Sequence, residues 1–171
     1  MIPGQGSAQI AINGFREVYE TGTDDVEFED GHTFKVCTLP GIVILKLIAF
    51  DDRPEIRQKD IKDIALILKH YFDIESDLIY DDHSDLFDAD KDLHYIAVRV
   101  LGRQIKSIIS KSEELTSRVI GILEMEINNP EKSVMGQLMV SGSEDSIFDA
   151  IELLKELLFG ITEELNLTNR S

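Results

Sequence analysis

The side chains best suited to chemistry form a charged run between residues 46 and 63. Its members are Lys46, Arg53, Arg57, Lys59, Asp60 and Asp63. Lys46 lies in an otherwise apolar segment, where an unpaired ammonium group is costly to bury, so we expect it either to extend to solvent or to meet a fixed anion. That anion would be the Asp60 carboxylate or the phosphate of a ligand. This run is therefore the first candidate for a binding site.

The same run also has a purely structural interpretation. Asp60 precedes Ile64 by one helical turn, which places its carboxylate at the border of an apolar stripe, and Asp63 lies one turn away on the neighbouring row. Arg57 is close enough in sequence to pair with Asp60. Charges at such spacing most often form paired or solvated helix faces. The spacing alone therefore favours an ion-pair network that ties two helices together.

Residues 39–64 also resemble a motif of a known family. Their sequence, LPGIVILKLIAFDDRPEIRQKDIKDI, is similar to the second half of the predicted nucleotidyltransferases related to the AbiEii toxins. These proteins are members of the polymerase-beta-like superfamily in which a lysine, an alanine, an arginine and a lysine-aspartate pair recur in this order. The similarity extends less closely through residues 15–19 and onward to about residue 123.

The resemblance implies roles for five residues. It implies that a nucleotide pocket lies beside Lys46 and Asp60. The supporting residues would be Arg53, Arg57 and Asp63. The family transfers a nucleoside monophosphate from a nucleoside triphosphate to an acceptor, and its carboxylates hold two divalent ions. A complete site is therefore expected to use a nucleoside triphosphate and Mg2+.

The catalytic carboxylates of the family have no counterpart at the expected places in this sequence. The family uses a glycine-rich turn, an aspartate-x-aspartate pair on one strand and a third carboxylate on a later strand. Because Lys46 comes so early, the strands that carry these groups would have to precede Met1. The segment Ile2-Pro3-Gly4 resembles only the end of the third-carboxylate strand, without its aspartate. We therefore expect the chain to be inactive alone and to supply the nucleotide-side, helical part of a site.

An alternative hypothesis is a non-catalytic interaction or regulatory module derived from the same family. In this case the chain would form a homo-oligomer or bind a protein partner through the apolar stripe of its last helix. The stripe consists of Ile147, Ile151, Leu154, Leu158 and Ile161. Packing of this stripe on its own domain is an equally good interpretation. The sequence does not identify an antitoxin or any other partner.

Metal sites are not predicted elsewhere in the chain. The acidic series from Asp88 to Asp92 lacks the glycine and the distal glutamate of a calcium-binding loop, since Leu93 and Arg99 occupy those positions. We interpret it as a solvated loop, with weak adventitious calcium binding as a minor option. The four histidines lack the paired spacing of a zinc site and are expected at the surface or at helix ends. They are His32, His70, His83 and His94.

Composition limits the classes of partner. The 171 residues include 33 acidic and 17 basic side chains, a formal net charge of −16, so the average surface repels nucleic acids and anionic membranes. The single cysteine, Cys37, excludes an internal disulfide framework and is typical of a reducing compartment. No apolar run approaches the length of a membrane span, and residues 1–14 do not resemble a signal peptide. A cytoplasmic protein is expected.

The expected fold is α+β and predominantly helical, with a small N-terminal antiparallel strand remnant followed by about five helices. Strands are predicted on either side of Asp30-Gly31, a pair that favours hairpin turns, and residues 15–19 are a possible third strand. Apolar periodicity predicts a helix from Thr38, which can cap it with Pro40 in the first turn, and a second helix over 55–72. Two more are expected around residues 95–109, interrupted only by Gly102, and over 115–125, where Met125 belongs to the apolar face. A last helix follows Ser143, which is its expected cap. Residues 73–92 are interpreted as an acidic connection with a short helical piece.

Three regions follow from this pattern. Residues 1–37 would be the strand remnant of a nucleotidyltransferase-like domain, and residues 38–128 its helical region. Residues 129–171 would form a C-terminal region built around an amphipathic helix.

Overall fold

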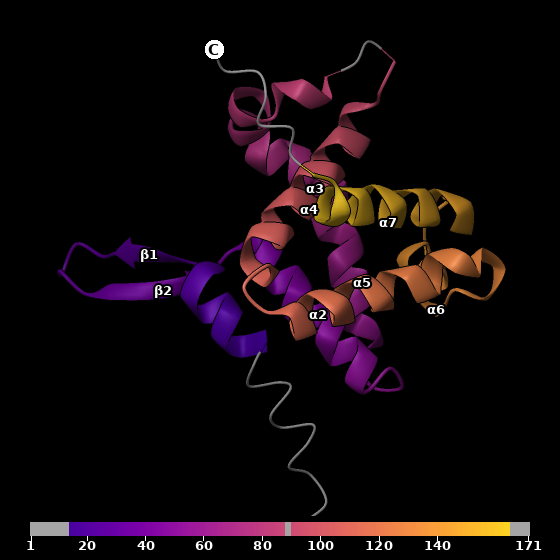
Figure 1. The fold of residues 1–171 in the computed structure, drawn as a ribbon, viewed down its shortest axis with the longest axis horizontal. Coiled ribbons are helices and arrows are strands. Elements are labelled where there is room, and N and C mark those ends of the chain that lie inside the picture. Colours follow the sequence, from indigo (N-terminus) through magenta and orange to yellow (C-terminus); the bar gives the residue numbers. More distant parts are fainter. Residues whose placement is uncertain (1–13, 88–89, 165–171) are drawn as a thin grey trace, which may run out of the picture.

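The structure is a computed structural model that describes residues 14–87 and 90–164. In chain order its elements are a helix at 14–21, β1 (Thr23–Glu27), β2 (Thr33–Cys37), α2 (Leu39–Asp52), α3 (Gln58–Asp82), α4 (Leu93–Ile109), α5 (Glu113–Asn128), α6 (Val134–Met139) and α7 (Ile147–Thr162). Short 3-10 turns occur at Ser84–Leu86 and Pro130–Lys132. Figure 1 shows a helical body from which the two strands project. The expected α+β, predominantly helical class is confirmed. None of the described helices is long and apolar enough to cross a membrane.

The two strands form the predicted antiparallel hairpin. Their register pairs Val26 with Phe34 and Asp25 with Lys35. The turn needs Gly31, whose φ of 83° lies in the left-handed region that favours glycine. Each strand pairs only with the other among the described residues, and Figure 1 shows the hairpin extending away from the helices.

The prediction of a third strand at residues 15–19 was wrong, because these residues lie in the helix at 14–21. Its side chains follow helical spacing. Phe15 and Tyr19, four residues apart, are both exposed, whereas Val18 is buried in the core. The short apolar-polar alternation was ambiguous, and packing of Val18 against the body decides in favour of the helix.

The helix α2 begins as the sequence predicts. The Thr38 hydroxyl accepts a hydrogen bond from the Gly41 amide, and Pro40 occupies the first turn, where its missing N–H costs nothing. Val43 and Leu47 are completely buried on this nearly all-apolar helix. It therefore passes through the centre of the fold, where its single lysine must find a partner.

The helix α3 is longer than predicted and continues to Asp82, so the interpretation of residues 73–92 as a mainly solvated connection was wrong up to that point. A kink at Glu75, whose backbone angles are not helical, divides it. Ile79 is fully buried beyond the kink, and Tyr80 stacks on Phe87 with ring centroids 5.0 Å apart. These apolar anchors keep the segment helical although its outer face is acidic. Asp88 and Ala89 lie outside the described residues.

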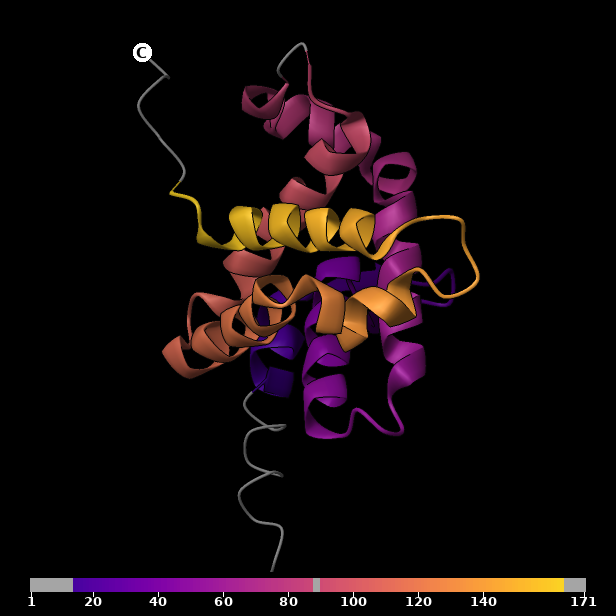
Figure 2. The same cartoon turned by 90° about the vertical axis from the view of Figure 1, so that its right-hand side faces the viewer.

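The last helix, α7, packs across α4, as Figures 1 and 2 show. Ile151, Leu154 and Ile161 are buried in the common core, so the interpretation in which this stripe packs on its own domain is confirmed.

The N-terminal cap of α7 is Ser146 rather than the predicted Ser143. Ser146 and Asp149 bond each other's backbone amides in a reciprocal capping box, a pattern that Ser143 cannot complete.

The helices α5 and α6 are joined through a buried carboxylate. Glu126 accepts hydrogen bonds from the Ser133 hydroxyl at 2.5 Å and from the Met135 amide at 3.0 Å. Met125, which was expected on the apolar face of α5, is exposed, and Glu126 lies inward instead. The amides at the N-terminus of α6 need a hydrogen-bond acceptor, which explains why Glu126 rather than Met125 lies inward.

A charged cluster fastens the end of α7 to α4 and to the 3-10 turn at Ser84–Leu86. The buried Arg103 guanidinium donates to both Asp85 oxygens, at 2.9 and 2.6 Å, and to Glu163 at 2.5 Å. It also lies 3.1 Å from Nδ1 of His83. His83 was expected at the surface or at a helix end; it caps the C-terminus of α3 and is buried there.

Candidate functional site

The lysine of α2 meets two carboxylates of α3. Lys46 Nζ lies 2.9 Å from Asp60 Oδ1 and 2.8 Å from Asp63 Oδ2. Asp60 and Asp63 stand one turn apart at the start of α3, so their side chains lie on the same side of that helix. The expected meeting of Lys46 with a fixed anion is thus fulfilled by the chain itself.

Partial burial lowers the pKa of Lys46, but hydrogen bonds and charge attraction from Asp60 and Asp63 outweigh it and raise the pKa above its ordinary value. The ammonium group therefore remains charged throughout the neutral range. It ties α2 to α3 across the break at Asp52–Gln58 and fixes where α3 begins.

The second oxygen of Asp60 is less well served. Oδ2 is buried without a hydrogen bond to any described residue, and Arg57 Nη1 lies 3.7 Å from it. Buried carboxylate oxygens normally have a hydrogen-bond donor, so an unsatisfied one requires an explanation. A shift of the half-exposed Arg57 side chain, a water or a ligand would satisfy it.

A hollow of about 200 Å3 lies beside this network, at the corner where α2 gives way to α3. It is lined by Phe15, Leu45, Ile48, Ala49, Asp52, Arg53 and Arg57. Two guanidinium groups and one exposed aromatic ring therefore share a single concave surface. No carboxylate among the described residues pairs with Arg53.

The carboxylate that lines this hollow is already neutralised. Arg118 of α5 reaches across and bonds Asp51 at 2.8 Å and Asp52 at 2.6 Å. Burial lowers the pKa of Arg118, but the hydrogen bonds that it donates to Asp51 and Asp52, together with their charges, raise the pKa by more, so the net pKa is above the ordinary value. The Asp52 charge is thereby offset, and the hollow keeps the positive charge of Arg53 and Arg57.

The five predicted site residues thus divide into two adjoining groups. Arg53 and Arg57 line the hollow, whereas Lys46, Asp60 and Asp63 form the ion-pair network behind it. Arg57 belongs to both, since it approaches Asp60 as well.

Sequence reasoning missed Phe15 and the Asp52–Arg118 pair. Phe15 was assigned to a possible strand, and no local pattern links Arg118 to Asp51 and Asp52, which lie 67 and 66 positions earlier in the chain. The structure shows that residues 14–21 are helical and that Phe15, on the outer side of this helix, is 61% exposed. An exposed aromatic ring beside two arginines is the additional feature that the structure contributes.

Comparison with protein families, with curated proteins and with solved structures found no match to this chain.

Proposed function

We propose that this chain binds a nucleotide at the hollow between α2 and α3, as the nucleotide-side part of a nucleotidyltransferase-like protein. The observation that carries the proposal is the pair Arg53 and Arg57 on one concave surface in a chain with a net charge of −16. Acidic side chains outnumber basic ones by almost two to one, yet Arg53 has no carboxylate partner among the described residues. Arg57 has only Asp60, at 3.7 Å, a carboxylate that Lys46 already binds. A guanidinium fork matches phosphate oxygens in geometry and charge.

Phe15 extends this chemistry from phosphate to nucleotide. Its exposed ring borders the same hollow, and aromatic rings offer nucleobases a stacking surface worth about 1–3 kcal/mol per base. The hollow has room for the phosphates, while the base and ribose would lie over Phe15 outside it. Such an arrangement recognises a nucleotide through charge and stacking and requires no base-specific contact.

Lys46, Asp60 and Asp63 act as positioning residues in this proposal. Their ion pairs fix the first turn of α3 and thereby hold Arg57, which immediately precedes it. The unsatisfied Oδ2 of Asp60 would accept a hydrogen bond from a ligand-bound water.

The proposal concerns binding rather than transfer. Among residues 14–87 and 90–164, no three His, Cys, Asp or Glu side chains are grouped so that they could hold a metal ion. The Mg2+ of a nucleoside triphosphate would accordingly be carried in by the nucleotide and held by groups from outside the described residues. The transfer step would take place only in a complete site.

Titration calorimetry with the Mg2+ complexes of ATP, GTP, CTP and UTP tests the proposal. We expect saturable binding that weakens at least tenfold in the double variant Arg53→Ala/Arg57→Ala and severalfold in Phe15→Ala. The matched control is Lys111→Ala/Lys132→Ala, which removes the same charge from exposed positions away from the hollow. Absence of binding at millimolar nucleotide, or equal loss in the control, would overturn the proposal.

Lys46→Met separates the positioning role from direct contact. If Lys46 acts through α3, this variant lowers nucleotide affinity and thermal stability together. A loss of affinity at unchanged stability would instead place the ammonium on the phosphate.

A further inference from the structure

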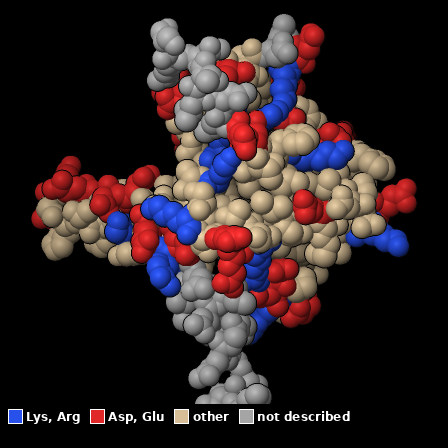
Figure 3. All heavy atoms as spheres, viewed as in Figure 1, with Lys and Arg blue, Asp and Glu red and all other residues tan. Residues whose placement is uncertain are grey.

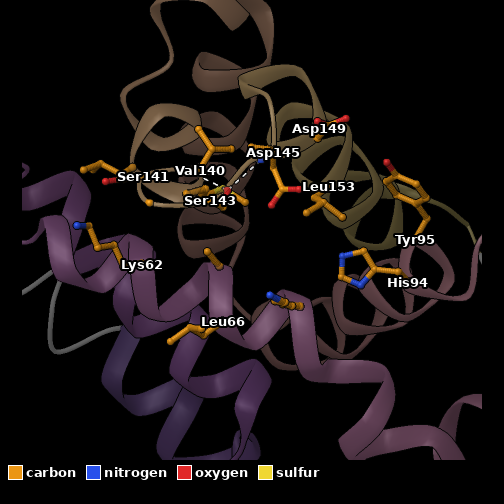
Figure 4. Close-up of a pocket in the computed structure, with 16 residues that line it drawn as sticks. Lys62, Leu66, His94, Tyr95, Val140, Ser141, Ser143, Asp145, Asp149 and Leu153 are labelled. Atoms are coloured by element: carbon orange, nitrogen blue, oxygen red, sulfur yellow. Dashed lines mark hydrogen bonds between the residues drawn. The ribbon is translucent and has the colours of Figure 1, made fainter.

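A second concave surface, which shares no lining residue with the hollow, lies along α3. This groove has a volume of about 790 Å3 and runs between α3 and the segment that joins α6 to α7. Figure 4 shows Lys62 and Leu66 on the α3 wall, with Ser143 and Asp145 on the facing wall. His94 and Tyr95, from the start of α4, close one end.

An apolar strip, covered by no other part of the described chain, lies between the charged rims of the groove. Leu66 is 57% exposed there, and Val140 and Leu153 from the facing wall are only partly buried. These side chains belong to three different elements, so the apolar strip is a property of the fold and not of one helix. An exposed apolar strip bordered by charges is typical of a protein interaction site.

The two walls carry opposite charge. Lys62 and Lys69 stand two turns apart on α3, and no described residue forms an ion pair with either. On the facing wall Asp145 has no cation partner among the described residues, while the carboxylate of Asp149 is occupied by Ser146. The groove thus presents a basic rim on one side and an acidic rim on the other.

The walls also decide what kind of chain segment fits. Helices α3 and α7 satisfy their own backbone groups. In the segment that joins α6 to α7, the amides of Ser141, Ser143 and Asp145 already donate to nearby acceptors. An extended peptide in the groove would therefore find no strand edge to pair with. A helix brings its backbone already hydrogen-bonded and offers only side chains. Helix-in-groove binding is therefore the mode that this surface permits.

We propose that the groove binds an amphipathic helix of a partner protein, with an apolar stripe on Leu66, an acidic flank toward α3 and a basic flank toward the start of α7. Lys62 and Lys69 are about 10 Å apart along the axis of α3, from a rise of 1.5 Å per residue. Acidic residues seven positions apart on a partner helix lying along α3 have the same separation. The rims also exclude a helix of uniform charge, because one flank would then face a like charge.

A synthetic helix tests this chemistry directly. The probe is a peptide of about three heptads with leucine at a and d, glutamate at e and lysine at g, which places the opposite charges on opposite flanks of the stripe. We expect saturable, micromolar binding to the full chain by fluorescence anisotropy. In amide NMR spectra the largest shifts are expected at Leu66, Tyr95 and Ser143.

Charge reversal provides the matched pair. Lys62→Glu/Lys69→Glu makes both rims acidic, so we expect at least tenfold weaker binding of the probe and recovered binding of a peptide with lysine on both flanks. Lys111→Glu/Lys132→Glu, with the same change in net charge away from the groove, should bind the original probe normally. Circular dichroism melting verifies that each variant is folded.

Three results would overturn the proposal. In the first, the protein binds neither the probe with glutamate on one flank and lysine on the other, nor a peptide with glutamate on both flanks, nor one with lysine on both. In the second, binding maps outside the groove or does not respond to the charge reversal. The third is a concentration-dependent dimer in light scattering that Leu66→Asp abolishes, which would assign the groove to a second copy of the chain.

Discussion

Gly102 of α4 and Gly160 of α7 touch where these helices cross, so closely that a Cβ on Gly160 would lie 2.8 Å from the Gly102 Cα and would collide with the Arg99 carbonyl oxygen. In sequence, Gly102 looked like an interruption of an amphipathic helix. In the structure, the two glycines allow α7 to bury its apolar stripe against α4.

The first prediction concerns this crossing. Gly160→Ala should destabilise the fold by about 1–3 kcal/mol, the usual range for overpacking, because the clash is with backbone and not with a flexible side chain. Gly121→Ala is the control: a Cβ there meets nothing within 4 Å, so better helix propensity should stabilise α5 by about 0.5–1 kcal/mol. Urea denaturation measures both; equal effects at the two sites would refute the close crossing.

The second prediction concerns the network between α2 and α3. Lys46→Met should cost about 1.5–3 kcal/mol, the range for hydrogen bonds to charged groups, because it leaves two carboxylates facing each other. Asp60→Asn should cost less, since Asp63 still pairs with Lys46. In the double variant the losses should be less than additive. Strict additivity in this double-mutant cycle would show that the pair is not coupled.

The third prediction is a loss of stability in mild acid. Arg103 can only donate, so Nδ1 of His83 accepts and carries no proton. Burial, and then the charge of Arg103, lower the pKa of His83 below its ordinary 6.5, although Asp85, Asp82 and Glu163 oppose this. The unfolded chain therefore binds the proton first, and stability should fall as the pH drops below 6.5.

Two carboxylates extend the same effect to lower pH. The hydrogen bonds from Arg103 lower the pKa of Asp85 despite its partial burial. Burial raises the pKa of Glu163, but the hydrogen bonds donated by Arg99 and Arg103, together with their charges, lower the pKa by more. The net pKa of Glu163 is therefore below the ordinary value. Stability should thus continue to fall below about pH 4.5. His83→Gln should remove the loss that begins below pH 6.5 and leave the loss below about pH 4.5, as measured by urea midpoints across the range. An unchanged profile would contradict the assignment.

The fourth prediction separates the buried and exposed faces of α7. Leu154→Asp places a charge in the core and should cost more than about 4 kcal/mol, enough to unfold many domains of this size. Phe148→Asp, on an exposed position of the same helix, should change stability by less than about 0.5 kcal/mol. Thermal melting and light scattering report stability and mass together. A folded Leu154→Asp variant with altered mass would mean that this stripe is an interface after all.

The features predicted correctly from sequence are those that depend on near neighbours in the chain. The Thr38 cap with Pro40 in the first turn, and the hairpin around Asp30-Gly31, need only residues within a few positions of each other. The spacing of Asp60 and Asp63 likewise placed both carboxylates on one side of α3. Because α2 and α3 are joined by a short break, their pairing with Lys46 was within reach of the same reasoning.

The errors occurred where distant contacts decide the structure. The stretch after Asp73 looked solvated because its acids dominate, yet Ile79 and the stack of Tyr80 on Phe87 keep it helical. The helical state of residues 14–21, and with it the position of Phe15, depends on Val18 packing into the body. Which surface of α3 lines the groove could not be inferred without the positions of α6 and α7.

The projecting hairpin has a consequence for handling the protein. Val26, Phe28, Phe34 and Val36 are 39–55% exposed on its apolar face, and both outer strand edges are free among the described residues. Such edges are templates for intermolecular pairing and fibril growth. In Figure 3 acidic side chains gather on this arm. Asp25 pairs with Lys35 at 3.2 Å, but Asp24 and Glu27 are exposed, and repulsion between these charges on different molecules opposes edge-to-edge pairing. Acidification or high salt weakens that repulsion, so turbidity should develop under those conditions through the hairpin while the helical body is still folded.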